Sequence, residues 1–122
     1  MKVNKLFFKE CNLAGRKYHD VNEVWDKLKV GTIVKLERDL ENHYDQNAIA
    51  VIFTDKTEDG NEDYLLGYIP ARENEGLAQI LEMGWGNIFE CRISKINGEA
   101  HYENQIRLTI KGRIQLANAI EF

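Results

Sequence analysis

Residues 42–47 combine an aromatic ring with short polar side chains at turn-forming spacing. Asn42, Asp45 and Asn47 carry side chains that fold back onto neighbouring backbone N–H groups and hold a tight connection. Tyr44 lies in the middle of this polar loop, where a ring is a poor core residue and a suitable stacking surface. The segment therefore offers a ring for stacking beside a carboxylate that accepts hydrogen bonds.

Asp45 is the most informative of these residues, because a carboxylate beside phosphate groups is repulsive. Such a residue suits a nucleic-acid site only where a strand ends, since a terminal hydroxyl carries no phosphate and donates a hydrogen bond. The alternative is that the carboxylate braces its own loop. The two roles are compatible.

Further candidate residues lie in other segments. Tyr18 follows the first predicted strand, so its ring and that of Tyr44 could clamp one or two bases, each stack contributing about 1–3 kcal/mol. The alternative is that either ring covers an end of the fold. Lys17 stands beside Tyr18 and could reach a phosphate, and Tyr68 lies on an adjacent predicted strand.

Two strands must position the loop. Val34 and Leu36 alternate with Lys35 and Glu37, the period of two that is typical of a half-buried strand. Residues 48–53 form a nearly unbroken apolar run rich in β-branched side chains, which predicts a more deeply buried strand. The polar loop is therefore expected to join the two strands of a hairpin.

The remaining elements complete a mainly β pattern. Four further strands are predicted over residues 5–13, 64–69, 88–96 and 105–111. Short helices are predicted over residues 20–28 and 74–84, with Asp20 and Asn74 as their capping residues. Residues 113–122 fit either a helix or a strand. Six strands at regular spacing favour a small barrel, although a curled α+β sheet also fits.

Cysteine, histidine and acidic residues give little support for a metal or cofactor. Cys11 and Cys91 are expected as buried reduced thiols, with a disulfide left open, and they form no zinc-binding spacing with the three histidines. The acidic run over residues 55–63 could suggest Ca²⁺, but its spacing fails the EF-hand pattern. We expect a solvated hairpin loop there, and no metal and no cofactor.

Composition limits the remaining possibilities. A chain of 122 residues fits one domain, and no apolar run approaches the roughly 18 residues that cross a membrane. We therefore expect cytoplasmic residence.

The net charge of −4 argues against duplex binding through a basic surface, whereas stacking at a strand end needs less charge. We expect no enzyme, because the sequence has no nucleophile elbow and no phosphate-binding glycine loop.

Three blocks of the sequence, in order, resemble the HIRAN domain family. The central block is Arg38-Asp39 followed by Asn42-x-Tyr44-Asp45-x-Asn47-Ala48-Ile49-x-Val51. Upstream, Leu13-Ala14-Gly15-Arg16-Lys17-Tyr18-His19 resembles the end of that family's first strand. Downstream, Leu66-Gly67-Tyr68-Ile69-Pro70 resembles its Gly-Tyr-Ile/Val-Pro strand. The resemblance covers roughly residues 5–112 of a single domain over residues 1–122.

The resemblance implies a modified OB-like β-barrel of six strands that binds the 3′ ends of single-stranded DNA in repair or replication. It implies that Tyr18 and Tyr44 stack the last bases, and that Asn42 contacts the terminal nucleotide. It also implies that Asp45 accepts a hydrogen bond from the 3′-hydroxyl, and that His19 occupies a position of the same site. Tyr68 is a weaker candidate for this site, because it lies on the adjacent predicted strand.

The sequence departs from the family pattern at several positions. Lys17 stands where well-studied members have Arg, so the planar fork that binds phosphate bidentately is lost. His19 stands where they often have a second Tyr, and His43 replaces a common Pro.

We expect a stand-alone domain of bacterial type that works beside a separately encoded helicase or nuclease. The alternative is a protein-interaction barrel that has lost DNA binding, which the acidic charge and these departures favour.

Overall fold

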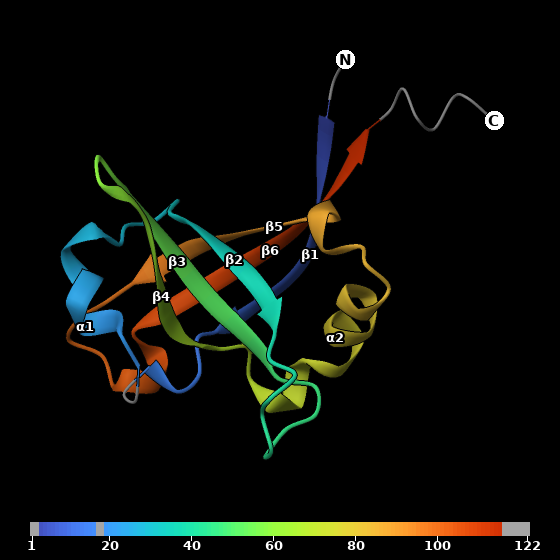
Figure 1. Cartoon of the computed structure of the whole chain (residues 1–122), viewed down its shortest axis with the longest axis horizontal. Coiled ribbons are helices and arrows are strands. Elements are labelled where there is room, and N and C mark those ends of the chain that lie inside the picture. The colour runs from blue at the N-terminus through green and yellow to red at the C-terminus, as the bar shows by residue number, and fades with distance from the viewer. Residues whose placement is uncertain (1–2, 17–18, 116–122) are drawn as a thin grey trace.

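The computed structural model describes residues 3–16 and 19–115 (Figure 1). Lys17 and Tyr18 lie outside the described residues, as does the segment 116–122. The strands are β1 (Val3–Asn12), β2 (Ile33–Arg38), β3 (Ile49–Thr57), β4 (Gly60–Tyr68), β5 (Phe89–Ile96) and β6 (Ile106–Gln115). The α-helices are α1 (Val21–Val24) and α2 (Glu75–Glu82). Within the described residues the predicted class, mainly β with six strands and two short helices, is confirmed.

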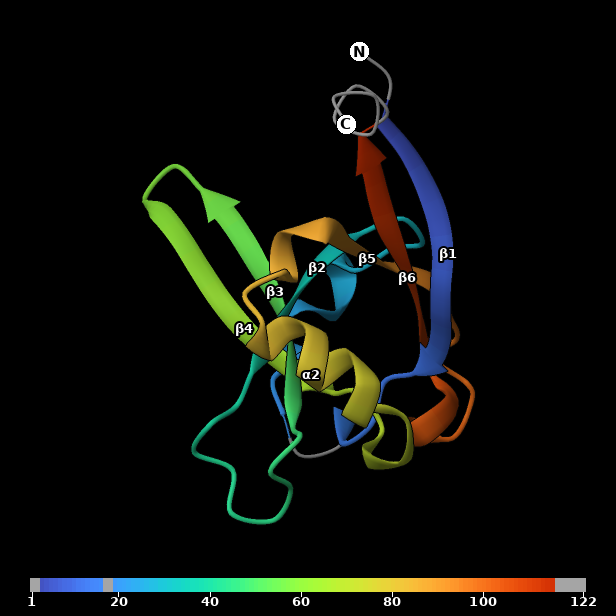
Figure 2. The same ribbon diagram turned by 90° about the vertical axis from the view of Figure 1, so that its right-hand side faces the viewer.

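The six strands form one antiparallel sheet in the order β1-β6-β5-β2-β3-β4. Figures 1 and 2 show this sheet curled, with β3 and β4 on one side and β1, β5 and β6 on the other. The edge strands β1 and β4 do not pair directly. Ala14, just beyond β1, exchanges two backbone hydrogen bonds of 2.8 and 2.9 Å with Tyr68 at the end of β4. The sheet is therefore joined at one point between its edges and is not closed by a continuous ladder.

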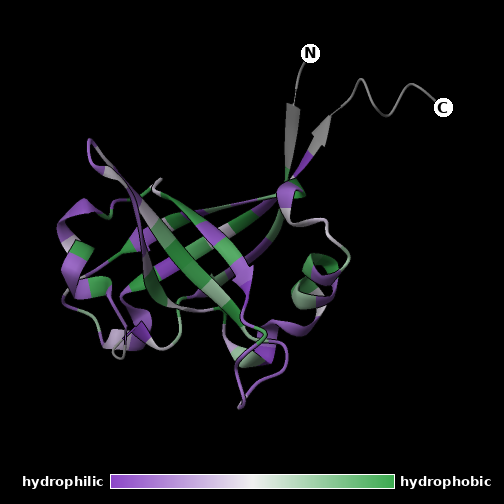
Figure 3. Ribbon diagram, in the orientation of Figure 1, coloured by the Kyte–Doolittle hydropathy of each residue, from purple (hydrophilic) through white to green (hydrophobic). Residues whose placement is uncertain are grey.

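The core fills the interior of the curled sheet. The predicted apolar stripe of β6 is buried throughout at Ile106, Leu108 and Ile110, and Cys91 and Ile93 on β5 face the same core. Each fully buried aliphatic side chain contributes about 1.5–3 kcal/mol relative to an exposed one. Figure 3 shows apolar residues concentrated along the strands and polar residues in the connections.

The two cysteines lie within this core. Cys11 and Cys91 are both buried and free, as expected from the sequence. Burial raises the pKa of the Cys11 thiol to about 11 and that of the Cys91 thiol to about 12. Both thiols therefore stay protonated at neutral pH and pack as small apolar groups.

The predicted solvated hairpin over residues 55–63 is confirmed, but the predicted length of its loop is wrong. Strands β3 and β4 continue through this run and pair as far as Thr57 and Gly60, which leaves a two-residue turn. Most of the charged side chains of this run stay exposed to solvent, and Asp63 has a cross-strand partner, since Thr54 donates a hydrogen bond of 2.6 Å to it. Asp55 forms an ion pair with Lys27. Within the described residues no group of three or more potential metal ligands is found, here or elsewhere.

Both predicted helix caps are also wrong in detail. Asp20 and Asn74 occupy the positions before α1 and α2, but neither side chain makes a capping hydrogen bond. The first helix is a single α-turn that continues as the 3₁₀ turn η2 (Trp25–Lys27), so it is shorter than predicted. The Asn74 side chain is instead engaged by Asp45 in the loop between β2 and β3.

Gly67 allows the two edges of the sheet to meet. A Cβ atom at this position would lie 2.3 Å from the Ala14 carbonyl oxygen and 3.0 Å from the Leu13 side chain. The first distance is to backbone, which cannot move aside without breaking the bridge between Ala14 and Tyr68. Only glycine fits where β4 approaches the segment after β1.

We therefore expect Gly67→Ala to lower the free energy of unfolding by about 1–3 kcal/mol through steric overlap. Gly76→Ala is the matched control, because a Cβ there meets nothing within 4 Å. Since Gly76 lies in α2, its replacement by Ala is expected to raise the free energy of unfolding by up to about 1 kcal/mol. Urea unfolding of both variants measures the difference, and equal effects would contradict this account of Gly67.

Candidate nucleic-acid interface

Residues 39–48 join β2 to β3 and extend from the lower edge of the molecule in Figures 1 and 2. Asn42 Oδ1 accepts hydrogen bonds from the backbone N–H groups of Tyr44 (2.9 Å) and Asp45 (3.0 Å). Asp45 Oδ1 accepts one from the N–H of Asn47 at 2.9 Å. The predicted fold-back of Asn42 and Asp45 onto the backbone is confirmed, and this local network fixes the loop.

Tyr44 presents its whole side chain to solvent. It is 99% exposed, and its hydrogen bond to Asn42 is made by its backbone N–H group. An exposed ring on a loop fixed by hydrogen bonds has no part in the core. It is available for stacking against another planar group.

Asp45 is half-buried and braces the loop through both carboxylate oxygens. Oδ2 accepts a hydrogen bond of 2.7 Å from Nδ2 of Asn74. Asn74 is buried, with 1% of its surface exposed. Oδ1 is held by the backbone of Asn47, as described above. A carboxylate has about four lone-pair positions, so acceptor capacity remains after these two bonds. The bracing role and the role of an acceptor for a ligand are therefore compatible.

Arg38 is a further determinant of the loop that the sequence reasoning left without a role. Its guanidinium donates to the carbonyl of Gln46 in the loop at 2.6 Å and to the carbonyl of Ala78 in α2 at 3.3 Å. It also forms an ion pair with Glu82. Arg38 thus connects the loop, at Gln46, to α2. The only signal in the sequence was its place in the Arg38-Asp39 pair.

Tyr68 connects the loop to the segment that follows β1. Its hydroxyl donates a hydrogen bond of 2.6 Å to Oδ2 of Asp39, and its ring lies 5.5 Å from the His19 ring, centroid to centroid. The hydrogen bond to the Asp39 carboxylate, with burial, raises the pKa of Tyr68 to about 12, while a hydrogen bond with Asn42 acts in the opposite direction. Tyr68 is therefore a link between segments and holds its proton at neutral pH.

The structure brings together most of the candidate residues predicted from the sequence. Asn42, Tyr44 and Asp45 share one loop, and the pair formed by Tyr68 and His19 lies at its base through Asp39. Lys17 and Tyr18 are outside the described residues, so their predicted roles remain predictions. Their flanking residues, Arg16 and His19, are joined by a backbone hydrogen bond of 3.4 Å.

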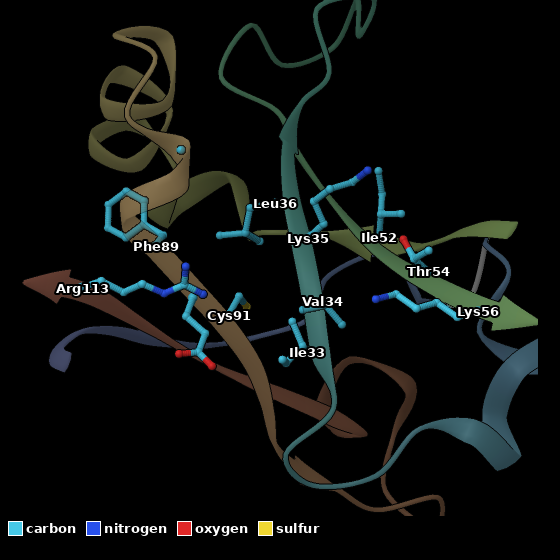
Figure 4. Close-up of a pocket in the computed structure, with 12 residues that line it drawn as sticks. Ile33, Val34, Lys35, Leu36, Ile52, Thr54, Lys56, Phe89, Cys91 and Arg113 are labelled. Atoms are coloured by element: carbon cyan, nitrogen blue, oxygen red, sulfur yellow. The ribbon is translucent and has the colours of Figure 1, made fainter. Parts of the chain in front are cut away.

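A pocket of about 380 Å³ lies elsewhere, beside the strand β2 (Figure 4). It opens because β2 and β5 share only two residue pairs, Ile33 with Arg92 and Val34 with Cys91. Its walls combine apolar side chains such as Leu36 and Phe89 with charged ones such as Lys35 and Lys56. It contains none of the candidate residues.

Comparison with known proteins identifies similar folds. The family model of the HIRAN domain matches residues 6–115. The crystal structure of a protein from Lactobacillus plantarum superimposes with a TM-score of 0.71 at 22% identity, covering 93% of this chain and 100% of that chain. The crystal structure of the HIRAN domain of human HLTF superimposes with a TM-score of 0.58 at 20% identity, covering 93% and 83%.

These similarities at low identity support the predicted OB-like architecture. A search of curated proteins gives no match to this sequence. In the described part of the chain, no helix is both long and apolar enough to span a membrane.

The raised pKa of Tyr68 predicts a loss of stability at alkaline pH. Because the folded state binds this proton more tightly than the unfolded chain, the contribution is complete below pH 10 and is lost between about pH 10 and 12. We expect wild-type protein to lose more of its free energy of unfolding between pH 9 and 11 than Tyr68→Phe does. Urea unfolding at both pH values measures this, with Tyr44→Phe as the exposed control. Equal losses in wild type and Tyr68→Phe would contradict the prediction.

Proposed function

This chain belongs to the HIRAN domain family, since the family model matches residues 6–115, and we propose that it binds single-stranded DNA at a free 3′-hydroxyl end. Members of this family are generally DNA-binding modules. The observation that carries the proposal is the fully exposed ring of Tyr44 on a loop fixed by hydrogen bonds, directly beside the carboxylate of Asp45.

Tyr44 is the stacking platform of the proposed site. Because its loop is already ordered by Asn42 and Asp45, little conformational entropy is lost when a base stacks on the ring. Such a stack contributes about 1–3 kcal/mol and is tolerant of base identity. Tyr18 is proposed as the second platform, and Lys17 as a contact to a phosphate.

Asp45 provides the selectivity for a strand end. Its remaining lone pairs accept a hydrogen bond from a 3′-hydroxyl, whereas a phosphate at the same place would be repelled. Asn74 orients the carboxylate by donating a hydrogen bond from its Nδ2 group to Oδ2 of Asp45. Asn42, whose Oδ1 is used by the backbone, is proposed to contact the terminal nucleotide through its exposed part, with His19 and Tyr68 forming the base of the site.

We propose a binding module without catalysis of its own, which acts beside a separately encoded helicase or nuclease in repair or replication. The acidic net charge agrees with recognition of an end by short-range contacts, because binding along a strand depends on a basic groove.

A second candidate function is a protein-interaction barrel that does not bind DNA. The edge strand β1 favours it, because Leu6, Phe7 and Phe8 are exposed large apolar residues in sequence, with Phe7 at 66% exposure. Exposed apolar side chains on a sheet edge are typical of interaction surfaces. Absence of DNA binding in the experiment below would favour this function.

Fluorescence anisotropy with a labelled oligonucleotide at low salt tests the proposal. We expect wild-type protein to bind a strand with a 3′-hydroxyl at least about tenfold more tightly than the same strand with a 3′-phosphate, because like charges in contact cost several kcal/mol. Asp45→Ala should weaken binding to the hydroxyl end and remove the discrimination. Equal affinity of wild-type protein for both ends would contradict end recognition.

Tyr44→Ala tests the stacking platform separately. We expect a loss of about 1–3 kcal/mol in binding free energy, or roughly 5- to 150-fold in affinity, with unchanged thermal stability. Trp85→Ala is the matched control, because Trp85 is another exposed ring (55%) but lies in the connection after α2. An equal effect of the two variants would sink the assignment of Tyr44.

A further inference from the structure

Arg16 is a buried cation held between two aromatic rings. It is only 6% exposed, and its guanidinium carbon lies 5.0 Å from the centroid of the Trp25 ring and 5.2 Å from that of Tyr102. Its Nη2 atom donates a hydrogen bond of 3.0 Å to Oδ1 of Asn22. These contacts join the segment after β1 to η2 and to the turn η5 (Tyr102–Asn104).

The charge of Arg16 has no carboxylate partner among the described residues. Arg38, Arg92 and Arg107 each form an ion pair with a glutamate, whereas Arg16 forms none, and its Nε atom is buried without a hydrogen-bond partner. Burial of an unpaired cation is unfavourable, and attraction to two ring faces offsets only part of that cost. A buried, uncompensated positive charge in a chain of net charge −4 points to an anionic ligand.

The guanidinium lines an open pocket of about 300 Å³ with preformed walls. Gly98 also lines the pocket, and the Nε2 atom of Gln105 holds its loop by donating hydrogen bonds to the carbonyls of Gly98 (3.2 Å) and Ala100 (2.9 Å). Gly98 packs so closely on Trp25 that a Cβ atom there would lie 3.1 Å from the ring. Both ring faces towards Arg16 are occupied by the guanidinium, so the pocket suits a small charged group better than a stacked base.

A continuous series of contacts leads from this pocket to the loop 39–48. Arg16 accepts the backbone hydrogen bond of His19, the His19 ring packs on Tyr68, and Tyr68 donates to Asp39 at the base of the loop. Figure 1 shows α1 and the neighbouring turn at the lower left and the loop at the bottom. If a strand whose 3′ end lies at Asp45 leaves across Tyr68 and His19, its upstream nucleotides approach Arg16.

We propose that the Arg16 pocket is a phosphate-binding subsite for a backbone phosphate upstream of the 3′ end. This inference rests on the proposed function and deepens it. The phosphate supplies the negative charge that the described carboxylates do not supply. Gln105 also lines the pocket, and its buried Oε1 atom has no partner; a water bound between this atom and the phosphate would satisfy both.

Salt dependence separates a phosphate contact from a purely structural role of Arg16. For single strands, each neutralised phosphate contributes about 0.7 to the slope of log association constant against log salt concentration. Anisotropy with a labelled ten-nucleotide thymidine strand over a range of NaCl concentrations measures this slope. We expect Arg16→Gln to weaken binding and to reduce the slope by about 0.7, and Arg16→Lys to keep the wild-type slope.

Arg113→Gln is the control, because Arg113 is exposed at the end of β6 opposite to η5 and should leave the slope unchanged. Binding by wild-type protein with an unchanged slope in Arg16→Gln would overturn the phosphate subsite and leave the proposed function standing. No binding by wild-type protein would overturn the proposed function and this inference together.

A second measurement covers the case in which Arg16→Gln does not fold. In the unmodified protein, the Nε–Hε resonance of Arg16 in a nitrogen-15 NMR spectrum should shift when the thymidine strand is added. An unshifted resonance in the presence of bound strand would overturn the proposal.

Discussion

The close approach of β4 to the segment after β1, which the missing side chain of Gly67 allows, is the constraint on which the rest depends. It lets Ala14 bond to Tyr68 and joins the two edges of the curled sheet at one point. Tyr68 is then held between His19 on one side and Asp39 on the other. Without this approach, the loop 39–48 and the segment after β1 would have no direct link, because they belong to strands that are not neighbours in the sheet.

The loop 39–48 is ordered by hydrogen bonds from residues outside it as well as by hydrogen bonds within it. Arg38 and Asn74 lie in or next to regular elements and donate hydrogen bonds into the loop. If the loop rearranged, Arg38 would lose its hydrogen bond to Gln46, and the buried Nδ2 group of Asn74 would lose its partner at a cost of about 1–3 kcal/mol. This cost keeps Tyr44 in one position although its ring contributes nothing to the core. The fold thus supplies, before any ligand arrives, the preorganisation that a stacking site requires.

The sequence predicted those features that depend on neighbouring residues. Alternation of apolar residues, and an unbroken apolar run over residues 48–53, located the six strands. The short side chains of Asn42 and Asp45 predicted a loop held by its own hydrogen bonds, because these signals act within a few positions. The roles of Asn74 and Arg16 were missed, since their partners come from distant segments that only the fold brings near. The loop over residues 55–63 was predicted too long, because strand pairing between β3 and β4 continues through this polar run, which the local charge pattern does not indicate.

Under the proposed function, the negative net charge acts as a device for selectivity. Glu82 pairs with Arg38 and Glu10 pairs with Arg107, so the positive charge of these two arginines is offset and attracts phosphates less. A strand lying across the site would bring an internal phosphate to Asp45 and be repelled, whereas a strand that ends there brings a hydroxyl. An unpaired cation at Arg16 then attracts the strand only at a distance from its end. The acidic chain is therefore better suited to binding a strand at its 3′ end than to binding along its length.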